Sequence, residues 1–381
     1  MAVASGRQQR LLVYISGHGY GHVAQVAPVL NQLARDQPNL ALVVCSMVAE
    51  GFLRSRIHAP FAYERRGADF GMLMHSALEV DVAASIAAYL DFHADWRARV
   101  EAEAAWIAGQ QADAVLSNVA YLPLAAASSL GIPALAMCSL NWADILQHYV
   151  ADPILDPVQQ QMRAAYASAR GFLRIEPAMK MPWLDCHAVG PVADIAMDSR
   201  TDILQATGLE EGRQYKLVLV GMGGISTQVN PAHFPRLPHV HWLLPQAWMQ
   251  GIERADFHAQ EPLQMHFSTL LASSDLVLTK PGYGTFVEAA CHGVPVLYVP
   301  RDGWPEQDCL VSWLSSHGRC LQVSAKQLAS GDMADSLLAM LNASRPGRVM
   351  PRGNREAAEW IALQLGLGSL ESIHGRNGGR G

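Results

Sequence analysis

The sequence of 381 residues is poor in charge: 16% of its residues are Asp, Glu, Lys or Arg, whereas half are hydrophobic. Disordered chains show the opposite balance, so the composition predicts a globular protein with room for two domains. Lys and Arg number 28 against 34 Asp and Glu, which gives a formal net charge of -6. A main partner made of nucleic acid would require a basic surface, and we therefore expect no nucleic-acid partner.

Cysteine is scarce and shows no pairing pattern. The six cysteines include no C-x-x-C pair, and several lie within apolar runs. This pattern predicts reduced, mostly buried thiols, as in a cytoplasmic protein. The first ten residues contain neither an apolar core nor a cleavage site, so we expect no secretory signal.

Two further absences bear on metals and membranes. Asp-x-Asp does not occur, so no carboxylate pair is evident for a divalent cation, and no metal site is predicted. The stretch from Ala114 to Ala143 contains no charged residue and would be long enough to span a bilayer. It is interrupted by Asn118, Pro123, Ser128, Ser129, Gly131, Pro133 and Asn141. We therefore predict a strand, helix and strand inside a core, and peripheral contact with a membrane stays open.

What the sequence does contain is a strand and helix pattern that occurs twice. The first begins with an apolar strand at 11–15, a glycine-rich turn at 16–22, a helix at 23–35 and a strand at 41–45. This order is typical of a Rossmann-like parallel sheet. Gly19-x-Gly21-x-x-Ala24 also fits the dinucleotide fingerprint. Cys45 and Ser46 stand where that fingerprint expects an acid, which argues against a nicotinamide site.

The pattern restarts with a strand at 215–220 and a second glycine-rich turn at 221–227. Residues 188–192, Ala-Val-Gly-Pro-Val, are typical of a hinge between domains. We therefore predict an α/β protein with one domain at 1–189, a second at 190–365 and a disordered tail at 366–381. A single long helix is expected at 85–109, and a loop between 57 and 85.

The most informative stretch lies between Ser274 and Gly293. It predicts a short buried strand, a turn containing Pro281, Gly282 and Gly284, and a helix that ends at Gly293. The first N–H groups of such a helix have no partner and attract a phosphate. Lys280 would add a positive charge, and Glu288 would accept hydrogen bonds from sugar hydroxyls. The alternative is a tight turn that needs glycine for close packing.

At this point the sequence resembles the GT-B glycosyltransferases over both halves. The resemblance is carried by the loop at 17–22, the Gly190-Pro191 linker, the stretch at 274–293, Pro305-Glu306-Gln307 and a helix near residue 360 that crosses back to the first domain. The greatest similarity is to the glycosyltransferase-like domain fused to L-arabinokinases, through residues 16–22, 116–118 and 138–144. Peptidoglycan N-acetylglucosaminyltransferase and the monogalactosyldiacylglycerol synthases are more distant relatives. The resemblance implies two Rossmann-like domains facing across a cleft, an acceptor domain at 1–189 and a donor domain at 190–365.

Candidate catalytic residues lie on the first turn. His22 is the expected general base because an imidazole can take a proton at neutral pH. The alternative is a histidine that caps its own helix. His18 is the second candidate, and it would contact phosphate or shape the turn. Asn118 stands where relatives have an aspartate that orients the base; an amide fixes the imidazole tautomer but supplies no charge, and Asp144 could substitute for it.

The donor-binding residues that the resemblance implies are Gly223, Gly224, Lys280, Gly282, Gly284, Thr285, Glu288, Glu306 and Gln307. The backbone of Gly284 and Thr285 would receive a phosphate, and the two glycines of the second turn would allow close approach. Lys280 is equally well a surface lysine, and Glu288 a solvated helix position. Glu306 and Gln307 would hold the donor sugar, or would cap a helix. The nucleobase would rest on backbone between Leu244 and Phe267.

The predicted function is glycosyl transfer from a nucleotide-sugar donor, with uridine diphosphate as the carrier, to a hydroxyl acceptor. The nucleotide sugar is a substrate, and no cofactor is predicted. Inverting chemistry without a metal is expected because a base is present and a helix can stabilise the diphosphate. Hydrolysis or epimerisation of a nucleotide sugar on the same scaffold is one alternative. A non-catalytic nucleotide-sugar-binding protein is another. No oligomeric state is predicted.

Overall fold

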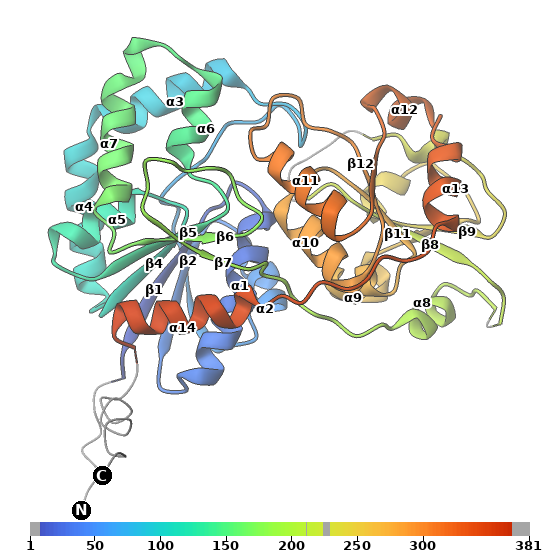
Figure 1. The fold of residues 1–381 in the computed structure, drawn as a ribbon, viewed down its shortest axis with the longest axis horizontal. Coiled ribbons are helices and arrows are strands. Elements are labelled where there is room, and N and C mark those ends of the chain that lie inside the picture. The colour runs from blue at the N-terminus through green and yellow to red at the C-terminus, as the bar shows by residue number, and fades with distance from the viewer. Residues whose placement is uncertain (1–7, 211, 224–228, 368–381) are drawn as a thin grey trace, which may run out of the picture.

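The computed structural model describes residues 8–210, 212–223 and 229–367. Two parallel sheets stand side by side, each with helices on both faces (Figure 1). This is the two-domain α/β architecture that the sequence predicts. The tail expected at 366–381 lies almost wholly outside the described residues, as does Gly224.

The N-terminal sheet has the order β3-β2-β1-β4-β5-β6-β7, and every neighbouring pair is parallel. Its strands are β1 (Arg10–Ile15), β2 (Ala41–Ser46), β3 (Phe61–Arg65), β4 (Ala114–Asn118), β5 (Ala134–Cys138), β6 (Phe172–Ile175) and β7 (Cys186–Val189). The central strands are uninterrupted apolar runs because helices cover both faces of a parallel sheet. Strand β3 lies in the segment expected to be a loop, so that expectation is wrong.

The helices of this domain are α1 (Tyr20–Asp36), α2 (Glu50–Arg56), α3 (Val82–Ala94), α4 (Trp96–Gly109), α5 (Leu122–Ser129), α6 (Trp142–Tyr149) and α7 (Asp156–Ala167). Alternate residues of β1 face opposite layers: Leu11 and Val13 pack with α1, whereas Leu12 and Tyr14 pack with α4, α5 and α7. The long helix expected at 85–109 is interrupted at Asp95, which separates α3 from α4.

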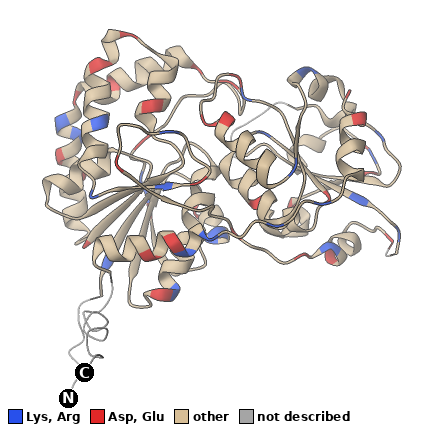
Figure 2. Cartoon of the chain, viewed as in Figure 1, with Lys and Arg blue, Asp and Glu red and all other residues tan. Residues whose placement is uncertain are grey.

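The uncharged stretch from Ala114 to Ala143 forms β4, α5, β5 and the start of α6, as predicted, and most of it is buried. Among the described residues, no helix combines the length and the apolar character needed to cross a bilayer. Charged residues of both signs are scattered over the outer elements, whereas the central strands β4, β5, β11 and β12 carry none (Figure 2).

The C-terminal sheet has the order β10-β9-β8-β11-β12-β13 and is also parallel. Its strands are β8 (Lys216–Gly221), β9 (Val240–Leu244), β10 (Phe257–Ala259), β11 (Leu276–Thr279), β12 (Val296–Tyr298) and β13 (Cys320–Gln322). The helices are α8 (Arg200–Ala206), α9 (Phe267–Ala272), α10 (Tyr283–His292), α11 (Gln307–His317), α12 (Ala325–Ser330), α13 (Ala334–Asn342) and α14 (Gly353–Leu365). Short 3₁₀ helices occur at η1 (Pro153–Leu155), η2 (Pro231–His233), η3 (Gln246–Met249) and η4 (Glu261–Leu263).

The last helix, α14, crosses back and packs against the N-terminal domain, as the sequence predicts (Figure 1). Its Trp360 ring stacks on His187 of β7, with ring centroids 5.1 Å apart. At its start, the backbone N–H of Gly353 donates to the Pro191 carbonyl at 3.0 Å. The hinge after β7 and the return segment before α14 therefore run side by side.

The two domains share one continuous hydrophobic core. Buried residues of β1, α1 and α14 continue into α10 and the inner face of the C-terminal sheet. Helices α1 and α10 come so close that a Cβ on Gly284 would lie 2.7 Å from the Cβ of Ala24. The glycine of the donor stretch thus serves interdomain packing, the alternative that the sequence left open, in addition to any role in ligand binding.

Candidate active site

A cavity of about 280 Å³ lies between the domains, where the carboxyl ends of both sheets face each other. In each sheet the connections reverse direction between two central strands, and a crevice opens at that point. The registers Ile15↔Asn118 and Thr279↔Gly221 mark these points. The cavity is lined by His18, Gly19, Tyr20, Gly21, His22, Ala24, Gln25, Phe52, Arg56 and Leu140 of the N-terminal domain. From the C-terminal domain come Val220, Gly221, Met222, Gly223, Pro245, Gln260, Phe267, Thr279, Lys280, Gly282, Tyr283, Gly284, Thr285, Glu288, Arg301, Trp304 and Glu306.

Helix α10 points its unpaired N-terminus at this cavity. Its N-cap residue is Gly282, and no side chain caps it. Within the described part of the chain, the first backbone N–H of α10 to find a partner is that of Phe286, which donates to the Gly282 carbonyl at 3.1 Å. The N–H groups of Gly284 and Thr285 therefore remain available at the positive end of the helix dipole. This is the arrangement that binds a phosphate.

Lys280 lies beside this helix start and is half-buried. A Cβ on Gly223 would lie 3.8 Å from its Nζ, and one on Gly282 would lie 3.9 Å from it. Burial, and next the nearby charge of Arg301, lower the pKa of Lys280 to about 7. Gly223 has a φ of 79°, which favours glycine. The ammonium group therefore sits over the two glycine turns; it is not a freely solvated surface group.

His22 lies in the first turn of α1, because this helix begins at Tyr20 and not at Val23 as expected. Its Nδ1 is 2.8 Å from the Oδ1 of Asn118 at the end of β4. An amide oxygen only accepts, so Nδ1 carries the proton and Nε2 keeps its lone pair. Burial lowers the pKa of His22 to about 4, so the ring is neutral at pH 7. The histidine does not cap its own helix.

A chain of hydrogen bonds extends from Asn118 into the other domain. The Nδ2 of Asn118 donates to Gln25 Oε1 at 3.0 Å, and Gln25 Nε2 donates to Ser139 Oγ at 2.7 Å. Ser139 Oγ then donates to Glu306 Oε1 at 2.5 Å. Trp304 Nε1 donates to the second oxygen of Glu306 at 3.2 Å. Glu306 therefore joins the two domains at the cavity, and its carboxylate does not cap α11.

Three of the described candidates do not line the cavity: Asp144, Gln307 and Asn118, the last of which is hydrogen-bonded to His22. Asp144 does not substitute for Asn118: its carboxylate accepts from Asn141 Nδ2 at 2.8 Å and from Trp183 Nε1 at 2.7 Å. Gln307 is the first residue of α11, and its Oε1 accepts the backbone N–H of Arg301 at 2.7 Å. Gln307 thus shapes the loop that carries Arg301.

Glu288 is not a solvated helix residue, so that alternative is wrong. It is 2% exposed, and its carboxylate pairs with Arg56 at the end of α2 in the other domain. Burial raises the pKa of Glu288, and the charge of Arg56 opposes this shift. Both side chains line the cavity, so the pair forms part of its wall. Nothing in the sequence marks Arg56, since the ion pair depends on how the domains pack.

A second group that the sequence does not reveal surrounds Trp304. The His18 ring stacks on Trp304, with centroids 5.7 Å apart and planes 7° apart. The guanidinium of Arg301 also lies over the Trp304 ring, at 3.8 Å from its centroid. Burial lowers the pKa of His18 well below its usual range and that of Arg301 to about 10. His18 Nε2 has no hydrogen-bond partner among the described residues.

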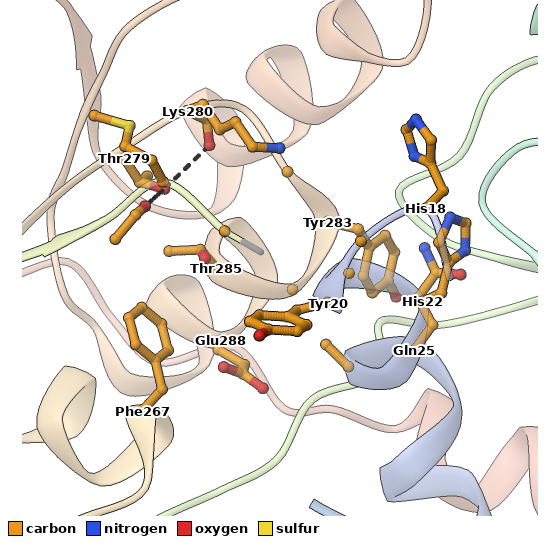
Figure 3. A pocket seen from close by; sticks show the side chains of 18 of the residues that line it. His18, Tyr20, His22, Gln25, Phe267, Thr279, Lys280, Tyr283, Thr285 and Glu288 are labelled. Atoms are coloured by element: carbon orange, nitrogen blue, oxygen red, sulfur yellow. Dashed lines mark hydrogen bonds between the residues drawn. The ribbon is translucent and has the colours of Figure 1, made fainter. Parts of the chain in front are cut away.

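Aromatic rings close the other end of the cavity. Tyr20 stacks on Phe52 of α2 with ring centroids 3.8 Å apart. Phe267 packs so closely on the end of β8 that a Cβ on Gly221 would lie 2.7 Å from its ring. Figure 3 shows Lys280, Thr285 and Phe267 on one side of the cavity, His18 and His22 on the other, and Tyr20 between them. Among the described residues, no three His, Cys, Asp or Glu side chains form a group that could hold a metal ion.

Comparison with solved structures identifies the fold. The chain is similar to CalG4, the calicheamicin glycosyltransferase, with a TM-score of 0.62 and 15% identity over 94% of this chain and 99% of that one. It is also similar to the glycosyltransferase of kitacinnamycin, with a TM-score of 0.58 and 15% identity over 94% of this chain and 100% of that one. These likenesses, together with the two facing sheets, define a protein of GT-B fold, as the sequence predicts.

One curated protein can be named as a relative in sequence. This chain is 25% identical over 340 residues to an L-arabinokinase from Arabidopsis thaliana, and the match covers 86% of this chain. The chain spans 32% of the length of that protein. No family model matches the chain. The similarity to part of an L-arabinokinase agrees with the resemblance carried by residues 16–22, 116–118 and 138–144.

Proposed function

We propose that this protein is a glycosyltransferase that binds a nucleoside diphosphate sugar, with uridine as the base, and transfers the sugar to a hydroxyl acceptor. One observation carries the proposal: the uncapped start of α10 and the neutral imidazole of His22 line the same interdomain cavity. A leaving diphosphate and an acceptor proton are the two charges that such a reaction must accommodate.

The donor would lie with its diphosphate at the start of α10. The N–H groups of Gly284 and Thr285 and the ammonium of Lys280 would stabilise the negative charge that develops as the glycosidic bond breaks. Preorganised donors of this kind are worth about 3–4 kcal/mol each in other enzymes. No metal is required in this scheme. The Glu288 carboxylate, held by Arg56, would accept hydrogen bonds from the ribose hydroxyls. The nucleobase would lie towards Phe267.

The acceptor hydroxyl would approach from the N-terminal domain and give its proton to Nε2 of His22. Asn118 holds the opposite ring nitrogen, which fixes the tautomer that this step needs. Attack from the face opposite to the diphosphate would invert the anomeric centre. Solved structures of similar fold support the donor class: one is a complex of the glycosyltransferase VinC with dTDP (TM-score 0.53), and another is a UDP-glucosyltransferase of Polygonum tinctorium (TM-score 0.53).

The test measures UDP binding by calorimetry and UDP release by chromatography from a panel of UDP-sugars, with and without a panel of hydroxyl acceptors. We expect UDP to bind and its release to require an acceptor. His22→Ala should lower turnover by about 10²–10⁴-fold and leave the Kd for UDP nearly unchanged. Glu288→Ala should instead weaken nucleotide binding. Failure of UDP to bind, or full turnover by His22→Ala, would refute the assignment.

A non-catalytic nucleotide-sugar-binding protein is the second candidate, and the pairing of His22 with Asn118 favours it. An amide cannot stabilise the imidazolium that forms when His22 takes a proton, and the pKa of about 4 makes this imidazole a weak base. The same experiment separates the candidates. Tight binding without turnover supports the binding protein, whereas UDP release in water alone supports a hydrolase.

A further inference from the structure

Arg301 is a buried charge that forms no salt bridge in the described part of the chain, although the charge of Glu306 acts on it. It follows β12 and is 4% exposed, yet its Nε and Nη2 have no hydrogen-bond partner in the described part of the chain. A buried ion that lacks a partner costs several kcal/mol. No group of the described chain offsets this cost by a hydrogen bond to Nε or Nη2. The Arg301 side chain lines the cavity. An anionic group of a ligand would supply the missing partner.

The two carboxylates of the cavity are already engaged. Glu288 pairs with Arg56, and Glu306 accepts from both Ser139 and Trp304. Burial and the charge of Arg301 lower the pKa of Lys280, and the charge of Glu306 offsets only part of this shift. In the described part of the chain neither Lys280 nor Arg301 forms an ion pair with these acids, although the charge of Glu306 acts on both.

Arg301 and Lys280 are neighbours in the cavity, since the charge of Arg301 helps to lower the pKa of Lys280, but the two side chains contact different groups. Lys280 extends over Gly223 and Gly282, next to the start of α10. Arg301 lies over the Trp304 ring, whose indole N–H donates to Glu306. Under the proposed function, the first place belongs to the diphosphate and the second to the donor sugar. The anion that Arg301 lacks is thus expected on the sugar.

The chemistry of the side chain selects the kind of anion. A guanidinium presents parallel N–H groups in a rigid plane, which match two oxygens of a carboxylate or of a phosphate. With the diphosphate placed at the start of α10, a carboxylate on the sugar is the remaining match. The guanidinium lies against the Trp304 indole, which also contacts the His18 ring, and this contact restrains its position. Tyr149 of α6 packs beside the same loop, since a Cβ on Gly303 would lie 3.6 Å from its ring. Its buried hydroxyl also has no hydrogen-bond partner among the residues that the structure describes.

We propose that the donor is a nucleotide-activated uronic acid and that Arg301 binds the carboxylate of its sugar. This inference rests on the proposed function, because it assumes a nucleotide sugar in the cavity. It assigns to Arg301 the selection of an acidic over a neutral sugar, and it separates this role from that of Lys280 at the diphosphate.

Calorimetry of the full chain with UDP, UDP-glucose, UDP-galactose, UDP-glucuronate and UDP-galacturonate tests the inference. We expect at least one UDP-uronate to bind on the order of tenfold or more tightly than the matching neutral sugar, the gain expected for a hydrogen-bonded charge pair. Arg301→Gln should remove this preference and leave the Kd for UDP unchanged. Lys280→Gln, the matched control, should weaken UDP and all four UDP-sugars by a similar factor.

Three results would overturn the inference. Equal affinity of the wild-type protein for acidic and neutral sugars would do so without any variant, and would leave the proposed function intact if UDP binds. A loss of UDP affinity in Arg301→Gln equal to the loss for UDP-glucuronate would assign the arginine to the diphosphate. Failure of UDP to bind the wild-type protein would refute the proposed function and the inference with it. Arg301→Lys keeps the positive charge but lacks the parallel N–H groups of the guanidinium. It should retain only part of the preference for UDP-uronates over neutral UDP-sugars.

Discussion

The charge of Lys280 should make donor binding depend on pH in a range where few other groups of the cavity titrate. Burial lowers the pKa of this lysine to about 7 in the empty protein. A bound diphosphate stabilises the ammonium form and raises the pKa towards its ordinary value. UDP affinity should therefore be complete below pH 7 and should fall as the pH rises through 7, because binding then requires the uptake of a proton.

The expected size follows from this shift. Half of the lysine is already neutral at pH 7, and each further pH unit costs close to a factor of ten, so the Kd for UDP should rise by about fiftyfold between pH 7 and pH 9, or about 2.3 kcal/mol. Calorimetry above pH 7 avoids the titration of the terminal phosphate, whose pKa lies near 6. In buffers of different ionisation enthalpy, it also counts the protons taken up.

Two variants of the same residue serve as controls. Lys280→Arg stays charged over the whole range, so its Kd should not change between pH 7 and pH 9. Lys280→Gln should bind weakly at every pH. A wild-type Kd that is constant from pH 7 to pH 9, or a slope that persists in Lys280→Arg, would show that the lysine does not bind the diphosphate.

Other predictions concern the hydrogen-bond chain, the interdomain ion pair and the hinge. Asn118→Asp should raise the pKa of His22 by about 1–3 units, which an NMR titration of the ring would detect. The acidic limb of the pH–rate profile should shift to higher pH by the same amount. Arg56→Met leaves Glu288 buried without a partner and should lower the free energy of unfolding by about 3–5 kcal/mol. The double variant with Glu288→Leu should recover most of this loss in denaturant titrations; no recovery would mean that the pair is not desolvated. Gly353→Ala should destabilise the protein by about 1–3 kcal/mol, because its Cβ would lie 2.0 Å from a hinge carbonyl oxygen; an unchanged melting temperature would contradict the close docking of α14.

The fold was predictable from the sequence wherever a strand is buried on both faces. β1, β2, β4 and β8 are continuous apolar runs followed by turns, and such runs have few alternative structures. β3 was missed because it is an edge strand whose side chains are only partly buried. Its polar residues give no alternation that would distinguish it from a loop.

The residues of the candidate site also divide into those that the sequence could predict and those that it could not. His22, Lys280 and Thr285 could be proposed because each follows a strand in a glycine-rich turn, and the carboxyl ends of parallel strands meet at one edge. Arg56 and Arg301 could not. Their positions depend on contacts between the domains, and no local spacing in the sequence records which arginine faces which cavity.

The return of α14 makes the C-terminal domain an insertion between β7 and that helix. Two chain segments, at the hinge after β7 and at the start of α14, connect it to its partner, and they are hydrogen-bonded to each other. A fragment that stops after β7 would lack α14, the helix that covers one face of its own sheet. Limited proteolysis in either segment should therefore unfold both domains together.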